Sequence, residues 1–177
     1  TSFSYGPSRQ LIKRVDVRSG QTTSTVMVDG LYEQVTLPSG VVEHKYFVGD
    51  AVVTKRTGTP VGDALSIKYL LKDHLGSTIA VVNDQGVVVQ QFIYDPWGKQ
   101  YNVYSNANLM LAYSSDATTK GYTGHEMVND FDVIHMGGRT YNPVIGRFMQ
   151  ADPNIQEAGN LQNYNRYSYV LNNPMRY

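Results

Sequence analysis

Glycine spacing is the feature of this 177-residue chain that most limits how it can fold. Through the first hundred residues a turn-favouring glycine returns about every ten residues, which is the spacing of short strands joined by tight turns. The positions are Gly20, Gly30, Gly40, Gly49, Gly62, Gly76, Gly86 and Gly98. Strands this short cannot each bury an apolar face alone, so neighbouring strands have to stack into a common sheet.

The content of tyrosine and glycine supports the same fold class. The chain has 14 tyrosines, which suit half-buried strand surfaces, and 16 glycines, which suit turns. We therefore expect an all-β protein, a meander of short antiparallel strands with at most one or two short helices near the C-terminus. Strands are expected at Leu11–Val17, Thr22–Val28, Leu31–Leu37, Val41–Val48, Ala51–Arg56, Leu65–Leu71, Thr78–Val82 and Val87–Tyr94.

The last third of the chain carries its own local signals. Tyrosine and leucine alternate along residues 165–171, which predicts a short aromatic strand, and the Asn-Asn-Pro sequence at 172–174 ends it. A short helix is expected between Ile155 and Gln162. Asp152 can cap this helix and Pro153 can occupy its first turn.

The chain divides into three stretches by the strength of these signals. Residues 1–100 form the strand meander, 101–120 are expected to be a connecting loop, and 121–177 form an ordered end region. Within the loop, residues 106–113 are compatible with either a helical turn or a strand. Because the first residue is Thr1 and not methionine, we expect the chain to be a fragment of a larger repeat structure.

Charge and composition argue against several functional classes. The 15 acidic and 15 basic residues cancel, and no basic cluster is present, so binding to nucleic acid is not expected. Cysteine is absent, which excludes disulfides and thiolate zinc sites. No stretch approaches the roughly 20 apolar residues that span a bilayer, and the first residues do not resemble a signal peptide.

The histidines and serines do not build a catalytic motif. His125-Glu126 begins like the helix of a zinc peptidase, but Asn129 stands where the second histidine is required. His74 follows an aspartate in a turn, where a solvated or hydrogen-bonded ring is expected. Ser77 lacks the Gly-x-Ser-x-Gly frame of an activated nucleophile. We expect no metal and no cofactor.

Several motifs together resemble the core region of the Rhs/YD-repeat family. The strings GRTYNPVIGRFMQADP at 138–153 and NRYSYVLNNP at 165–174 carry the resemblance most strongly. The motifs GLYE, HKYFVG, DHLGS and YDPWG occur upstream in the order in which the family has them. The family comprises repeat-built shells that enclose C-terminal toxin domains in bacterial secreted effectors. Similar shells occur in the C components of insecticidal toxin complexes, and related repeats occur in animal teneurins.

The resemblance implies a structural role for the chain. It is expected to form part of the β-cage wall that encapsulates and delivers a C-terminal toxin domain. The implied partners are that toxin domain, the remaining repeats of the shell and secretion-system proteins. The implied location is that of a secreted or delivered effector used in competition between bacteria, or the cell surface. A truncated shell exposes open strand edges, so self-association is also expected.

The resemblance also implies candidate site residues. In many relatives the shell cuts its own chain after a second Asp-Pro-x-Gly motif, and the aspartate matching Asp152 and a core arginine are implicated. Arg139 and Arg147 are the candidate arginines here. The chain ends before that second motif, and an aspartyl mechanism requires two carboxylates, so a self-cleaving peptidase remains an alternative, with no activity expected on other proteins. The structural interpretation, which we favour, makes Asp152 a turn cap and lets the arginines stack on Tyr141 or Phe148 or pair with a carboxylate.

A third alternative is an extracellular adhesion or carbohydrate-binding surface. It depends on tyrosines exposed at strand edges. The strand period of Tyr167 and Tyr169 instead favours a role in the core or the shell lining, and we expect the same of Trp97. Loss of glycan binding on replacement of exposed tyrosines would support the adhesion hypothesis.

Overall fold

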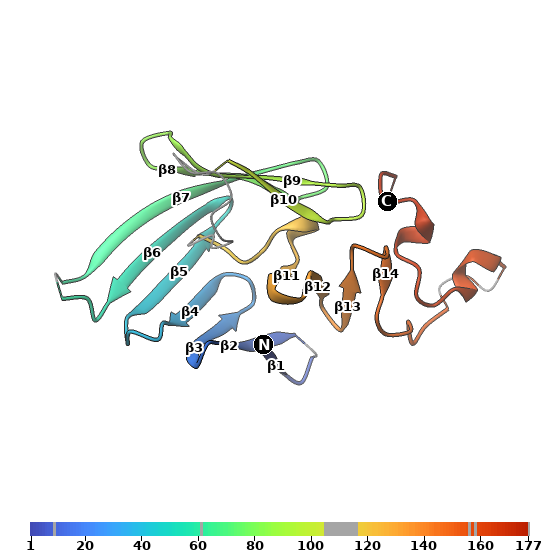
Figure 1. Ribbon diagram of the computed structural model, residues 1–177, viewed down its shortest axis with the longest axis horizontal. Helices are drawn as coiled ribbons and strands as arrows, with labels where there is room; N and C mark the ends of the chain where they lie inside the picture. Colours follow the sequence, from blue (N-terminus) through green and yellow to red (C-terminus); the bar gives the residue numbers. More distant parts are fainter. Residues whose placement is uncertain (9, 61, 105–116, 156, 158, 177) are drawn as a thin grey trace.

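The protein is a long curved antiparallel sheet followed by a small second sheet (Figure 1). The computed structural model describes residues 1–8, 10–60, 62–104, 117–155, 157 and 159–176. In the long sheet each of ten strands pairs with its neighbours in sequence. These strands are β1 Ser2–Tyr5, β2 Leu11–Arg18, β3 Gln21–Val28, β4 Tyr32–Thr36, β5 Val42–Val48, β6 Ala51–Thr57, β7 Ala64–Lys72, β8 Thr78–Asn83, β9 Val88–Tyr94 and β10 Gln100–Tyr104.

Tight turns produce this meander, as the glycine spacing predicts. Between β2 and β3 the paired residues Arg18 and Gln21 flank a two-residue turn. Both turn residues have positive φ, 48° at Ser19 and 78° at Gly20, which matches the right-handed twist of the flanking strands. The all-β prediction is confirmed, and the eight predicted strands agree with β2 to β9 within one or two residues at each end.

Two strands of the long sheet were not expected from the sequence. β1 lies at one edge of the sheet and β10 at the other. β10 takes up residues that we assigned to the connecting loop, so the meander continues past residue 100. The stretch 106–113, for which a helical turn or a strand was expected, lies outside the described residues.

The small sheet follows the connecting stretch and lies on the concave side of the long sheet (Figure 1). Its strands are β11 Glu126–Val128, β12 Val133–Met136, β13 Arg139–Asn142 and β14 Arg147–Phe148. The described helical structure consists of short 3-10 turns, namely η1 Tyr122–Gly124, η2 Asn129–Phe131, η3 Leu161–Tyr164 and η4 Val170–Asn172. No helix in the described ranges is long and apolar enough to cross a membrane.

Two predictions for the last third are wrong. The described residues between 155 and 160 are not helical, and η3 begins only at Leu161, where the Asn160 side chain accepts a hydrogen bond from the Gln162 amide. Residues 165–171 do not form a strand. They make one isolated β-bridge, between Ser168 and Arg147, and the chain then enters η4. Leu171 has a φ of 53°, which is incompatible with an extended strand.

The core has two parts that meet where the sheets face each other. The core cluster on the small sheet is mainly aromatic. Its buried residues are Tyr122, Tyr141, Phe148, Tyr169, Met127 and Ile134. A second cluster under the long sheet consists of Val52, Leu70, Val81, Phe92 and Ala117. Tyr94 packs against both clusters and so joins the sheets.

Candidate functional site

The turn between β9 and β10 is one place where the long sheet holds the small sheet. The Asp95 carboxylate closes the turn by accepting hydrogen bonds from the backbone amides of Trp97 and Lys99, both at 2.9 Å. Two carbonyls of the turn then accept from buried tyrosines: Tyr122 donates to Pro96 at 2.8 Å, and Tyr141 donates to Trp97 at 2.9 Å. The YDPWG motif is therefore a docking turn.

Burial of these two tyrosines fixes their protonation state. Tyr122 and Tyr141 have relative exposures of 2% and 0%. Burial raises the pKa of both hydroxyls well above their ordinary value, and the neighbouring Tyr169 contributes in the same direction. Both hydroxyls therefore stay protonated and act as hydrogen-bond donors to the docking turn.

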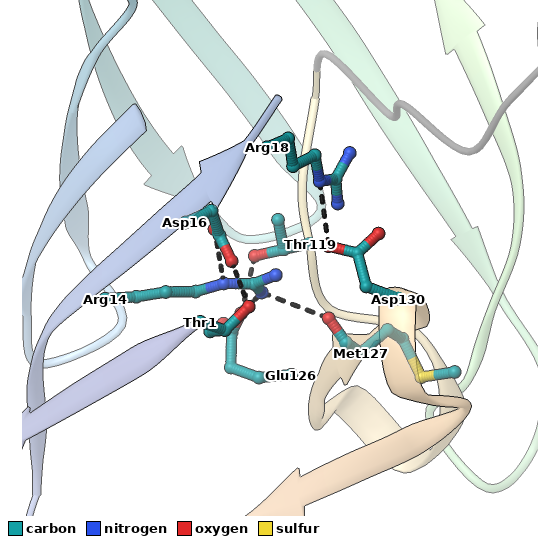
Figure 2. A network of polar contacts seen from close by, with 8 residues as sticks. All are labelled: Thr1, Arg14, Asp16, Arg18, Thr119, Glu126, Met127 and Asp130. Atoms are coloured by element: carbon teal, nitrogen blue, oxygen red, sulfur yellow. Dashed lines mark hydrogen bonds and ion pairs between the residues drawn. The ribbon is translucent and has the colours of Figure 1, made fainter. Parts of the chain in front are cut away.

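A polar network around Arg14 is the second connection between the sheets (Figure 2). Arg14 projects from β2 and is almost fully buried. Its Nε donates to Asp16 at 2.8 Å, and its Nη1 donates to the Met127 carbonyl at 3.0 Å. The same Nη1 lies 3.6 Å from Glu126 on β11. Because one guanidinium reaches both sheets, Arg14 fixes their spacing.

Glu33 on β4 lies in the same interior region without a matched partner. It lines a cavity of about 280 Å³ between the long sheet and residues 118–121. Its Oε1 atom has no hydrogen-bond partner within the described structure. Burial raises the pKa of Glu33 to about 7, and repulsion from Glu126 adds to the shift, whereas Lys45 and other nearby cations oppose it.

The predicted site residues Asp152 and Arg139 come together at the end of the small sheet. The Arg139 Nη2 atom lies 2.9 Å from Asp152 Oδ2, and the guanidinium stacks 3.7 Å from the centre of the Phe148 ring. Asp152 Oδ1 accepts a hydrogen bond from the Asn154 amide at 2.9 Å, which closes a local turn. Both interactions that the structural interpretation assigned to these residues are present.

A cavity of about 360 Å³ lies beside this ion pair. Its lining combines amide, hydroxyl and charged side chains with an apolar wall, and Asp152 is the only carboxylate among the described residues that line it. The lining residues are Arg139, Phe148, Asp152, Asn154, Asn163, Asn165, Arg166, Ser168, Tyr169, Val170 and Leu171. The Arg166 Nε atom donates to the Asp152 carbonyl and closes one side of the cavity. The arrangement orients the Asp152 carboxylate, and the described residues that line the cavity supply no second acid next to it.

The other candidate arginine, Arg147, is not part of this site. β14 alternates, so Phe148 points into the core and Arg147 is exposed on the opposite face. Arg147 lines a different surface depression with Trp97 and Pro143. The aromatic residues also separate: Trp97 and Tyr169 belong to the core as predicted, whereas Tyr167 is 46% exposed and does not.

Sequence reasoning missed Arg14, Glu33 and Glu126. Each lies on a strand at a position that faces the interior. Such a charged residue is recognised as buried only once it is known which face of the strand points inward. For Glu33 the available signal is the alternation with Val35, which places both side chains on the buried face of β4. In the described residues no group of three His, Cys, Asp or Glu side chains is arranged to hold a metal ion.

We expect Arg139→Ala to lower the free energy of unfolding by about 1–2 kcal/mol, because it removes a partly buried ion pair and a cation–π contact. Arg147→Ala is the matched control, since Arg147 is exposed, and it should change stability by less than about 0.5 kcal/mol. Urea unfolding followed by tryptophan fluorescence measures both. Equal effects of the two substitutions would contradict the assigned structural role of Arg139.

Comparison with known proteins places this arrangement among repeat-built shells. Salivary gland surface protein 1 of Aedes aegypti is 36% identical over 107 residues, covering 60% of this chain and 3% of that protein. The toxin subunit YenC2 of Yersinia entomophaga is 29% identical over 194 residues, covering 99% of this chain and 19% of that protein. The chain therefore spans a small part of the length of each relative.

A solved structure has the same fold over almost the whole chain. It is the Tc holotoxin pore of Photorhabdus luminescens, which matches with a TM-score of 0.74 and 19% identity over 98% of this chain and 8% of that chain. The family model described as the teneurin YD-shell matches residues 61–175, which include the docking turn, the small sheet and the Arg139–Asp152 pair. The chain thus belongs to the teneurin YD-shell family of the Rhs/YD-repeat proteins.

Proposed function

We propose that this chain is the closing part of a YD-repeat shell that encloses a C-terminal toxin domain. The observation that carries the proposal is the way the long sheet bends around the small sheet and is fixed to it at both of its ends (Figure 1). At one end Tyr5 of β1 bonds to His135 of β12. At the other end Tyr141 of β13 bonds to the docking turn after β9. A wall fixed at both ends to an inner lobe is suited to closing a container.

The edges of the long sheet support a place within a larger wall. β1 and β10 are the edge strands, and neither pairs with a further strand in the described part of the chain. Unpaired edges are templates for additional strands. The remaining repeats of the shell are the proposed partners at these edges, and a second copy of the chain is the proposed partner when those repeats are missing.

The relatives support the proposed cargo and delivery. YenC2 is a toxin subunit, and the structural neighbour is part of a Tc holotoxin. By analogy the enclosed domain is a toxin, and the complete protein is secreted or delivered by a bacterial secretion system. The containment mechanism requires no catalysis by this chain: the wall separates the toxin from the surroundings until the shell opens.

Protease protection tests this proposal on the longer protein that contains this chain and the domain following it. We expect the following domain to resist limited proteolysis while the shell is intact and to be cut rapidly when it is expressed alone. A shell opened with a denaturant concentration that leaves the free domain folded should lose the protection. Cutting at the same rate with and without the shell would contradict enclosure.

Self-cleavage is a separate question, which depends on Asp152. In the cavity beside Asp152 the described lining offers no second carboxylate, and we therefore propose that Asp152 is structural. The intact mass of the longer protein decides this point. A structural Asp152 predicts the same mass for the wild type and the Asp152→Asn variant, whereas a cut in the wild type alone would make Asp152 catalytic.

A further inference from the structure

The contact between β1 and β12 joins segments that are far apart in the sequence. The Tyr5 hydroxyl bonds to Nε2 of His135, 130 positions further along the chain. Tyr5 and Phe3 also pack on the imidazole, with ring centroids 5.6 Å and 4.6 Å from it. The His135 side chain is only 4% exposed. We call these contacts of Phe3 and Tyr5 with His135 the amino-terminal latch.

Apart from the latch, β1 is held weakly. It has four residues, pairs only with β2, and its register shifts between Ser4 and Tyr5. The Thr1 hydroxyl adds one exposed hydrogen bond to Asp16. Short edge strands open locally at a free-energy cost well below that of global unfolding. The latch is therefore a large part of what keeps β1 on the small sheet.

The groups around His135 disfavour a positive charge on its ring. Arg14 on β2 faces it and is itself positively charged, with its guanidinium committed to Asp16 and to the Met127 carbonyl. Thr140 on β13 and Glu126 on β11 are its cross-strand neighbours. The Glu126 carboxylate is engaged through Oε2 by the Thr119 hydroxyl and by Arg14, whereas its Oε1 atom is buried and has no hydrogen-bond partner among the described residues. The second histidine, His125, lies close enough to repel a charged His135.

These surroundings lower the pKa of both histidines. For His135 burial is the main cause, Arg14 adds to it, and a backbone hydrogen bond opposes it. For His125 burial and the charge of His135 lower the pKa, and Glu126 opposes them. Burial raises the pKa of the Tyr5 hydroxyl, so Tyr5 keeps its proton and is able to donate it to Nε2 of a neutral His135 ring in the tautomer that leaves this nitrogen unprotonated.

The sign of the pH dependence follows from this direction. Above the ordinary histidine pKa of about 6.5 both rings are neutral in the closed and the open state, and the latch has its full stability. As the pH falls below that value, an exposed His135 takes up a proton before a latched one does. Protonation then favours the open state, and the loss of stability continues until the pH passes the lowered pKa of the closed state.

We propose that the amino-terminal latch is an acid-sensitive device that releases β1 from the small sheet at mildly acidic pH, while β2 to β10 stay paired. Release exposes the apolar faces of Phe3 and Tyr5 and frees the edge of the long sheet. The device depends only on contacts within this chain. The proposal can therefore be tested whether or not a toxin is enclosed.

Hydrogen exchange read by mass spectrometry tests the latch on the chain as it is. Between pH 7.5 and pH 5.5, after correction for intrinsic exchange rates, we expect protection of residues 1–8 to fall several-fold, with a ceiling of about tenfold, because a histidine with the ordinary pKa of about 6.5 is about nine-tenths protonated in the open state at pH 5.5. Peptides from β5 and β6 should keep their protection. In His135→Gln, which retains an acceptor but does not titrate, the pH-dependent loss should shrink to less than about threefold.

His44→Gln is the matched control, because His44 makes the same kind of bond to Tyr32 within the long sheet, away from β1. It should leave the pH-dependent release unchanged. The proposal is overturned if wild-type protection is independent of pH, or if the His135→Gln variant loses protection as the wild type does. Should His135→Gln fail to fold, ring titration of wild-type His135 by NMR decides instead, and an unshifted pKa with constant protection of β1 overturns the proposal.

Discussion

Gly98→Ala is expected to lower the free energy of unfolding by about 3 kcal/mol or more, through backbone strain and overpacking together. Gly98 ends the docking turn with a φ of +89°, which L-residues rarely adopt. A Cβ atom at this position would lie 2.5 Å from Cδ1 and 2.7 Å from Cγ of Tyr122. The ring cannot move aside, because Tyr122 is buried and its hydroxyl is bonded to Pro96.

Gly86→Ala separates the two causes. Gly86 has a φ of +78° in the turn between β8 and β9, but no heavy atom lies within 4 Å of the point that an alanine methyl group would occupy there. This control carries the backbone strain alone and should cost about 1 kcal/mol. Urea unfolding of both variants measures the difference. Equal losses would mean that the Tyr122 ring accommodates the added methyl group at no cost, which would contradict overpacking at Gly98.

Glu33→Gln is expected to stabilise the protein at alkaline pH by about 3 kcal/mol, at roughly 1.4 kcal/mol for each unit of pKa shift. The pKa of Glu33 rises from 4.5 to about 7 on folding. Below pH 4.5 the carboxyl is largely protonated in both states, so its ionisation no longer lowers the stability. Between pH 4.5 and 7 the folded state has to hold a proton that the unfolded state releases, and above pH 7 the full cost of the buried charge is present.

Unfolding at pH 8 and at pH 4.5 measures this effect, and the stability difference between Glu33→Gln and the wild type should shrink at the lower pH. Glu43→Gln is the control, for which we expect a change in stability of the opposite sign. Glu43 is equally buried but accepts from Arg56 at 2.7 Å and lies 3.5 Å from Lys45. Removing its charge takes away the carboxylate that lies 3.5 Å from the buried Lys45, leaves Glu33 as its nearby carboxylate, and should destabilise by about 3 kcal/mol. Destabilisation by Glu33→Gln at pH 8 would show that the ionised carboxylate is matched.

The long sheet was predictable because each of its turns is specified locally. Glycine at positions such as Gly20 and Gly49 takes positive φ directly between paired strands, so each hairpin is defined within a few residues of sequence. β1 and β10 have weaker local signals. β1 is kept in place partly by His135, which lies far away in the sequence and which no local pattern connects to it.

The structure of the end region was harder to predict from the sequence, because tertiary contacts override its local pattern. The alternation of Tyr167 and Tyr169 is typical of a strand, but only Tyr169 packs into the core. Its ring centroid lies 4.5 Å from that of Tyr141. The chain turns instead, and Tyr167 is exposed. The same limit applies to the site: sequence reasoning selected Asp152 with two arginines, and only the alternation of β14 decides which of them is excluded.

The strictly sequential order of the long sheet has a consequence for synthesis on the ribosome. Every strand from β2 to β10 pairs with the strand made immediately before it, so the wall can grow hairpin by hairpin as the chain emerges. The contacts that close it span 113 residues for Arg14 and Met127 and 130 for Tyr5 and His135, and they form last. The long sheet is therefore complete before Met127 and His135, which make the closing contacts, are synthesised.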